Sequence, residues 1–490
     1  MKTFFEKNAI FLLLPLFLYW TGPAKAQHPA SFMVNGRRIA ADSFDRQVNT
    51  LINEVGVPGI SLAVIDNNQV VFSNVYGYKD LETKTKADDS TVFEAASLSK
   101  TFLVYVVDQL LDEGRLDLDK PMYQYLENPR LAHDPRYKRI TPRMILSHSS
   151  GIENWQRYNN PDTLEIVADP GTRFVYSGEG FQYLAAVVDT ILREPYEQYI
   201  RERVLQPLQL KNTYPRYTDN GNVPADYATG YDNFGIKFNK WKNRETVPAS
   251  GMHLVARDYA RLIISLFDGK HLSGNRIRAI YQPIIPLSQD NPAIYFGLGL
   301  AVQYSPTDTI VFHNGSNDGF KAMMWYSVVH RCGLVILTNG DRENVMEKKI
   351  CELSVNFNLD AYFRNDDYQQ YPSAACDLFK LYRQGDSAGM FSRIAEWRQQ
   401  GRLDVKTLNE LGQLFSGSHK VIARQLLEEN IQLYPESSIA YYSLGKFHMS
   451  VREYESAYAD FKKAKELNYD RVKVDAAINN CTARLTESKK

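Results

Sequence analysis

The chain of 490 residues has no excess charge of either sign and few cysteines. Its 57 basic and 57 acidic side chains cancel, which argues against a nucleic-acid partner, because such a partner requires a basic surface. Two interpretations of the four cysteines stay open, buried free thiols or two disulfides in one of three pairings. Their scattered spacing does not resemble a metal site: Cys332, Cys351, Cys376 and Cys481.

The apolar run at the N-terminus is too short for a convincing membrane span. It reads AIFLLLPLFLYW, follows a start that carries Lys2 and Lys7, and precedes Ala24-Lys25-Ala26, a small-residue cleavage site. This pattern predicts a secretory signal peptide over residues 1–26, with an uncleaved membrane anchor as the alternative. The cleaved chain would be periplasmic or secreted and would have no stable membrane span.

Hydrophobic periodicity predicts a mixed region followed by an all-helical one. Residues 38–56 show the spacing of an amphipathic helix, and residues 59–77 read as a β-hairpin that turns at Asp66-Asn67-Asn68. Residues 296–338 read as consecutive antiparallel strands, with Gly315 and Gly319 at a turn between two of them. Strand signals vanish after about residue 370.

The helical region shows an internal period. Leu411-Gly412 lies 33 residues before Leu444-Gly445, and Ala423 lies 34 residues before Ala457. These spacings resemble tetratricopeptide repeats over residues 376–490, with a divergent pair at 376–400 and a capping helix at 471–486. Ordinary helical hairpins are the alternative. The region would either hold a protein or peptide partner in a groove or serve as a packing appendage.

A candidate nucleophile and its base lie in the stretch FEAASLSKTFLVYVVDQLLDEG, residues 93–114. Ser97 and Lys100 are three residues apart, so a helix would place both side chains on one face. The following residues are apolar on nearly every side, which predicts a buried helix, and Gly114 supplies a stop. A serine hydroxyl needs a nearby base, and a lysine can serve only when it is neutral.

Two further clusters occur in a suggestive order. Tyr176-Ser177-Gly178 precedes an apolar helix, and His313-Asn314-Gly315 lies on a late strand. With Ser97-x-x-Lys100 and the flanking segments PGISLAVI, ITPRMILSHSSGI and GSNDGF, they make residues 38–365 resemble the serine β-lactamase and penicillin-binding-protein superfamily. The likeness is greatest to its class C-type branch of esterases, D-amino-acid peptidases and β-lactamase-related hydrolases.

The resemblance implies roles for six residues. Ser97 would be the nucleophile, Lys100 and Tyr176 would share the proton transfers, and His313, Gly315 and Ser316 would line the substrate side. The backbone N–H groups of Ser97 and Ser316 would form the oxyanion hole. Gly315 would let the substrate backbone approach the strand. Lys100 as a charged neighbour would lower the pKa of Tyr176, and which of the two is the working base stays open.

Departures from the superfamily pattern concern the substrate more than the mechanism. Gly178 stands where the second motif often ends in Asn, and His313 stands in place of a lysine that would bind a substrate carboxylate. Both weaken the expectation of β-lactamase or D-Ala-D-Ala carboxypeptidase activity. His148 and Glu179 are candidates for a base and a water-positioning group, but a loop-holding histidine is the favoured interpretation of His148, and a structural role suits Glu179 equally well.

The expected fold is α+β: an antiparallel sheet flanked by helices, an all-helical subdomain, and then an all-α repeat domain. The expected function is that of an exported serine hydrolase that acts through an acyl-enzyme on an ester, amide or peptide, with no metal and no organic cofactor. The alternative is a non-catalytic scaffold that binds a ligand or peptide. It would be supported if Lys100 and Tyr176 turned away from Ser97.

Overall fold

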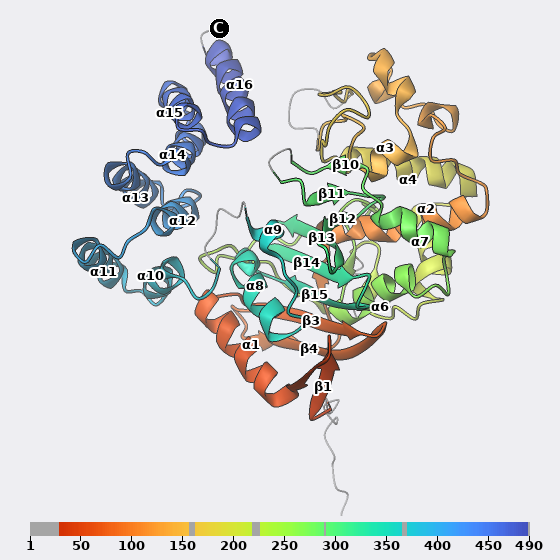
Figure 1. Ribbon diagram of the computed structural model, residues 1–490, viewed down its shortest axis with the longest axis horizontal. Helices are drawn as coiled ribbons and strands as arrows, with labels where there is room; N and C mark the ends of the chain where they lie inside the picture. Colours follow the sequence, from red (N-terminus) through yellow and green to blue (C-terminus); the bar gives the residue numbers. More distant parts are fainter. Residues whose placement is uncertain (1–28, 156–161, 218–225, 289–290, 365–369, 489–490) are drawn as a thin grey trace, which may run out of the picture.

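The structure is a computed structural model that describes residues 29–155, 162–217, 226–288, 291–364 and 370–488 (Figure 1). The predicted signal peptide lies outside these ranges. Within them, no helix is both long enough and apolar enough to cross a membrane.

A nine-stranded antiparallel sheet organises the N-terminal three quarters of the chain. Its strand order is β10-β11-β12-β13-β14-β15-β3-β4-β5, so the late strands that the sequence predicted pair in succession and then meet the N-terminal hairpin. The strands are β10 (Ile285–Pro286), β11 (Ile294–Phe296), β12 (Ala301–Tyr304), β13 (Thr309–Asn317), β14 (Phe320–Ser327), β15 (Cys332–Thr338), β3 (Gly59–Asp66), β4 (Gln69–Asp80) and β5 (Thr85–Lys86).

The N-terminal hairpin is confirmed, and its turn chemistry explains it. Asn67 and Asn68 both adopt positive φ, 48° and 58°, which is the conformation that a two-residue hairpin turn requires and asparagine tolerates. The predicted helix is also present as α1 (Ala41–Val55). It starts three residues late, because β2 (Arg37–Ala40) pairs with β1 (Ser31–Val34) instead.

Helices cover both faces of the sheet. On one face α1 and α8 (Glu343–Leu353) pack over a core that includes Phe44, Trp325 and Ile336. On the other face α6 (Ala256–Phe267) packs together with the helical subdomain of α2 (Lys100–Asp112), α3 (Pro142–Leu146), α4 (Gly178–Leu192) and α5 (Tyr196–Ile200). The fold is therefore α+β, as expected, and α2 runs through the second core.

The predicted glycine turn is half right. Gly319 lies at the β13–β14 turn with φ of 73°, but Gly315 lies inside β13, opposite Ala322 of β14. The hairpin is tighter than the sequence suggested, because Asn317 already pairs with Phe320.

The C-terminal region is all helical and follows the sheet domain as an arc of helices (Figure 1). Close approach of paired helices explains the small residues at the periodic positions: a Cβ on Gly412 would lie 2.5 Å from Leu427, and one on Gly445 would lie 2.7 Å from Phe461. Assignment to tetratricopeptide repeats stays a prediction. The helices of the arc are α10 (Ala374–Arg383), α11 (Ser387–Gln399), α12 (Val405–Phe415), α13 (Lys420–Leu433), α14 (Ser438–Ser450), α15 (Tyr454–Glu466) and α16 (Arg471–Ser488), whereas α9 (Asp360–Phe363) still packs on the core of the sheet domain.

Candidate active site

Ser97 lies on a short turn between a strand and a buried helix. Strand β6 (Thr91–Glu94) leads into the 3-10 turn η1 (Ala96–Ser99), and α2 begins at Lys100. Ser97 and Lys100 thus lie where this helical stretch begins, Ser97 in the 3-10 turn and Lys100 in the first turn of α2. Ala96 has φ of 45°, an unfavourable conformation for a residue with a Cβ, which persists only where the surrounding packing enforces it.

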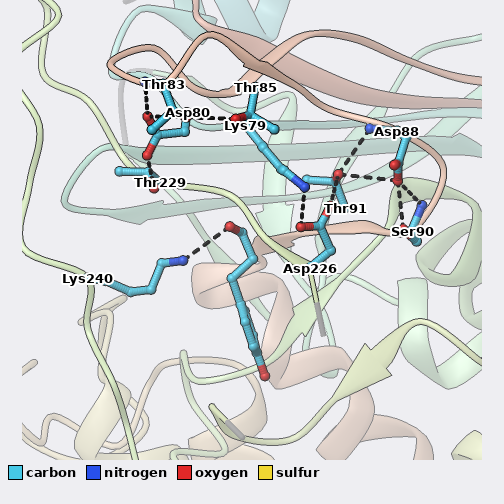
Figure 2. A network of polar contacts seen from close by, with 11 residues as sticks. Lys79, Asp80, Thr83, Thr85, Asp88, Ser90, Thr91, Asp226, Thr229 and Lys240 are labelled. Atoms are coloured by element: carbon cyan, nitrogen blue, oxygen red, sulfur yellow. Dashed lines mark hydrogen bonds and ion pairs between the residues drawn. The ribbon is translucent and has the colours of Figure 1, made fainter. Parts of the chain in front are cut away.

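Polar contacts fix the strand that carries this turn (Figure 2). The Thr91 hydroxyl donates to Asp226 at 2.6 Å, and Lys79 of β4 forms an ion pair with the same carboxylate. Asp226 belongs to β8 (Asp226–Tyr227), which pairs with β6 in a small second sheet with β9 (His253–Leu254) and β7 (Thr213–Tyr214). Contacts from two sheets thus position the approach to Ser97.

The Lys100 amine points at Ser97. Its Nζ lies 3.1 Å from Ser97 Oγ and 2.8 Å from the carbonyl oxygen of Ala249. The side chain is fully buried, with Nζ 4.9 Å from the centre of the Tyr176 ring. Burial lowers the pKa of Lys100 to about 7, because the apolar surroundings disfavour the charged amine. A large neutral fraction near pH 7 suits a general base.

Tyr176 lies within reach of the Ser97 side chain, whose polar interaction with it lowers the tyrosine pKa. Burial outweighs this effect and raises the pKa of Tyr176 to about 12. The expected lowering by Lys100 is therefore wrong, because desolvation dominates the shift of this pKa. At neutral pH the Tyr176 hydroxyl therefore keeps its proton.

His148 holds the tyrosine segment in place. Its Nδ1 accepts a hydrogen bond from the Ser177 backbone N–H at 3.0 Å, and its ring lies 4.1 Å from the Tyr176 ring at an angle of 30°. Burial, followed by the charge of Lys100, holds the pKa of His148 well below its usual range. A neutral ring with Nδ1 already engaged matches the loop-holding interpretation of His148.

Strand β13 passes directly beside η1, the turn that carries Ser97. A Cβ on Gly315 would lie 2.6 Å from the carbonyl oxygen of Ala95 and 3.1 Å from the backbone nitrogen of Ser97. The glycine is needed for this packing of the strand against the turn, and its expected role in the approach of substrate stays a prediction. Ser316 follows it, and its Oγ accepts a hydrogen bond from Lys321 Nζ at 2.8 Å.

His313 is buried and neutral. Its Nδ1 lies 2.6 Å from the carbonyl oxygen of Asn314, and burial, then Lys100, lowers the pKa of His313 to about 3. It lies beside Tyr176, with ring centres 6.4 Å apart. This histidine therefore contributes no fixed positive charge to the site.

The two other departures have local explanations. A Cβ on Gly178 would lie 2.4 Å from the Trp155 ring, so the indole occupies the space that an asparagine side chain would need. Glu179 pairs with Arg130 at 3.0 Å, which favours its structural interpretation.

A cavity of about 340 Å³ adjoins Tyr176 and His313. Its volume lies in the range of small-molecule sites, roughly 300–1,000 Å³. Among the residues that the structure describes, the lining carries aromatic, aliphatic and neutral polar groups and no ionic side chain: Phe174, Tyr176, Leu287, Ser288, Asn291, Ile294, Phe296, Ala301, Phe312, His313, Asn314 and Tyr362.

Several contributors to the site left no signal that sequence reasoning could have used. Ala249 acts through its backbone carbonyl, and its own N–H donates to Gln182 Oε1 at 3.0 Å. Asn317 donates to the buried Glu94 carboxylate at 2.7 Å and to the carbonyl oxygen of Ser250 at 3.4 Å. These two bonds link β13 to β6 and to the segment whose Ala249 carbonyl accepts from Lys100. Burial raises the pKa of Glu94 to about 7.

A serine, a buried lysine and a tyrosine converge beside strand β13 of an antiparallel sheet, and this arrangement is typical of β-lactamase-like folds. The family model for Beta-lactamase matches residues 44–350, well over half of the chain. The chain belongs to the β-lactamase family, whose members are serine hydrolases.

Relatives in the family are distant. Protein flp of Staphylococcus aureus strain MW2 is 25% identical over 335 residues, which cover 63% of this chain and 65% of that protein. The chain thus covers just under two thirds of the length of this curated relative. The mouse mitochondrial serine beta-lactamase-like protein LACTB is 31% identical over 136 residues, 28% of this chain and 25% of its own length.

Solved structures support the same fold. A penicillin-binding protein homologue from Pyrococcus abyssi superimposes with a TM-score of 0.53 at 23% identity and covers 61% of this chain and 73% of that one. The hydrolase EstCE1 gives 0.54 at 21% identity and covers 64% and 98%. A class C beta-lactamase gives 0.53 at 20% identity and covers 61% and 91%.

Proposed function

We propose that this protein is a serine hydrolase that forms an acyl-enzyme on Ser97 with ester or amide substrates. The observation that carries the proposal is the contact of the fully buried Lys100 Nζ with Ser97 Oγ at 3.1 Å. In the scaffold alternative, Lys100 and Tyr176 would have no reason to converge on the serine. Both groups point toward it.

The arrangement assigns each proton a path. Neutral Lys100 takes the Ser97 proton as Oγ attacks the substrate carbonyl, and the carbonyl oxygen gains negative charge beside the N–H groups of Ser97 and Ser316. The Tyr176 hydroxyl gives its proton to the leaving group and regains one from Lys100. Water then repeats the sequence on the acyl-enzyme and releases Ser97.

The cavity supports a preference for apolar, uncharged leaving groups. It contains Tyr176, the residue that would protonate the leaving group, so it lies on that side of the scissile bond. The described residues of its lining include no ionic side chain, and the neutral His313 cannot pair with a carboxylate. A buried, unpaired carboxylate is costly, so a substrate with a carboxylate on the leaving group should bind poorly. Substrates of β-lactam and D-Ala-D-Ala type are correspondingly disfavoured.

Covalent labelling tests the reaction. A fluorophosphonate probe should label the full-length protein on Ser97, and Ser97→Ala should abolish labelling without loss of folded protein. A folded wild type that gives no adduct with fluorophosphonates or penicillin-type probes would contradict the proposal. A screen of short-chain esters, D-amino-acid amides, nitrocefin and muropeptides then ranks the substrate classes.

Matched phenyl acetates test the leaving-group preference. We expect kcat/KM for an ester with a meta-carboxamide to exceed that for its meta-carboxylate by about tenfold or more. Asn314 is an exposed residue of the cavity wall, so Asn314→Lys should narrow this ratio by supplying a cation. A wild-type ratio near one would contradict the assignment of the cavity to an apolar leaving group.

Export is the second part of the proposal. The pattern of residues 1–26 supports cleavage near Ala26. N-terminal sequencing of the protein from its native host should find Gln27 first, in a periplasmic or secreted fraction. An intact N-terminus in the membrane fraction would favour the anchor alternative.

A further inference from the structure

The C-terminal helices contact the β-lactamase-like domain at two points that lead to the catalytic site. The first is Arg342, which directly precedes α8 and is almost completely buried. Its guanidinium lies 3.4 Å from the Glu410 carboxylate of α12 and 4.7 Å from the centre of the Phe379 ring of α10. The Arg342 side chain, which comes from the segment between β15 and α8, is thus enclosed by the helical region.

The residue before Arg342 begins a chain of contacts to the strand beside Ser97. Asp341 Oδ1 accepts hydrogen bonds from Lys321 Nζ at 2.8 Å and from the backbone N–H of Gly319 at 3.2 Å. The same ammonium group donates to Ser316 Oγ at 2.8 Å. Asp341 therefore holds both the turn of the β13–β14 hairpin and, through Lys321, the residue expected to supply an oxyanion-hole N–H.

The second point is Phe234. Its ring lies among side chains of α10, α12 and the residue before α13: it is 5.4 Å from Phe379, 5.5 Å from Phe415 and 4.5 Å from His419. The segment that carries Phe234 is bound to the residues that follow β15, because the Tyr231 N–H donates to the carbonyl oxygen of Asn339 at 3.1 Å.

We infer that the C-terminal helices position the active site, with Arg342 and Phe234 as anchors and Asp341 and Lys321 as the positioning residues that act on Ser316. The inference rests on the proposed function, since it assigns Ser316 to the oxyanion hole. Of the two expectations for this region, a partner-binding groove or a packing appendage, it develops the second and gives the packing a catalytic consequence.

Variants of the full-length protein test the chain of contacts. Lys321→Met should lower kcat roughly tenfold with KM within about twofold, short of the roughly 10²–10³ lost with an entire oxyanion-hole donor. Lys321→Arg, which keeps a cationic donor, should restore most of the rate. Loss of folded protein would also lower the apparent kcat at constant KM, so kcat is calculated per active site counted by fluorophosphonate titration. A kcat that still falls per titrated site distinguishes positioning from a smaller active fraction.

The anchor is tested by replacing the buried pair with apolar groups, Arg342→Met/Glu410→Leu, which avoids leaving one charge unpaired. This variant should lose kcat to a similar extent and should not slow Lys321→Met much further, because both changes act through one chain. Lys380→Met is the matched control: it removes another ion pair between the regions, to Glu54 at 2.5 Å, away from Ser316. Its kcat should equal that of the wild type.

The outcomes separate the two claims. Unchanged kcat in a folded Arg342→Met/Glu410→Leu variant, or fully multiplicative effects with Lys321→Met, would overturn the inference alone. If that variant does not fold, Phe234→Ala takes its place: reduced kcat supports the inference, and unchanged kcat overturns it. A wild type that is never labelled at Ser97 refutes the proposed function and this inference with it.

Discussion

At the scale of the residue, Lys100 combines a functional position with an energetic cost. A fully buried amine whose pKa is lowered to about 7 makes folding less favourable wherever the unfolded chain keeps its proton. The contacts to Ser97 and Ala249 compensate for only part of this desolvation. Catalytic groups often carry such a cost, because the environment that tunes them is unfavourable for a charge.

Lys100→Met should therefore abolish labelling and raise the stability of the fold. Between pH 7 and about 10.4, the unfolded chain binds the proton that folded wild type has released, so wild-type stability rises with pH in this window. The advantage of Lys100→Met should be largest, a few kcal/mol, at and below pH 7 and should shrink toward pH 10. Urea unfolding at pH 6.5, 8 and 9.5 measures it, and an advantage that grows with pH would contradict the assignment.

The same pKa sets the pH dependence of the rate. Hydrolysis of a neutral ester should rise through about pH 7 as Lys100 loses its proton and then stay level, because Tyr176 keeps its proton until about pH 12. Glu94 titrates in the same range, so Glu94→Gln is the control. An inflection that persists in this variant belongs to Lys100, whereas one that disappears would assign it to Glu94.

At the scale of the element, the site depends on how closely β13 packs against η1, the turn that carries Ser97. Gly315→Ala would place a methyl group 2.6 Å from the carbonyl oxygen of Ala95 and push the strand away from Ser97. We expect kcat to fall by about tenfold or more. Gly274→Ala is the matched control: Gly274 opens α7 (Gly274–Tyr281) with no atom near its missing Cβ, so kcat should not change. An unchanged kcat in Gly315→Ala would show that β13 can shift without harm to the site.

Elements with local signals were predictable, and their assembly was not. Ser97 and Lys100 are neighbours along the chain, and the alternation of β13 to β15 is evident in their residues, so the sequence indicates both. The carbonyl of Ala249 and the amide of Asn317 are generic polar groups, and only the pairing of distant segments gives them a role. The presence of Gly178 where the superfamily often has Asn is explained only by the structure, in which the Trp155 ring fills the space beside it.

At the scale of the whole molecule, a buried ion pair joins the two regions. Arg342 and Glu410 are both almost inaccessible, and removing one partner leaves the other charged and buried. Glu410→Ala should cost roughly 3–5 kcal/mol, whereas Glu54→Ala, which breaks an exposed pair with Lys380, should cost at most about 1 kcal/mol. Urea unfolding compares them, and equal losses would mean that the buried pair contributes no more than a surface one.

The four cysteines, open between two interpretations from the sequence, are all free and buried, and they are distributed over the whole molecule. Cys332 and Cys351 lie in the core beneath α1, where burial raises the pKa of each thiol to about 12. Cys376 lies near Arg342 at the junction, and Cys481 lies in α16. An intact molecule should resist alkylating reagents, because protonated, inaccessible thiols react slowly. The rate of alkylation at a given cysteine would therefore report how fast its own region opens. Mass spectrometry could then follow the core, the junction and the C-terminal end separately, without any introduced label.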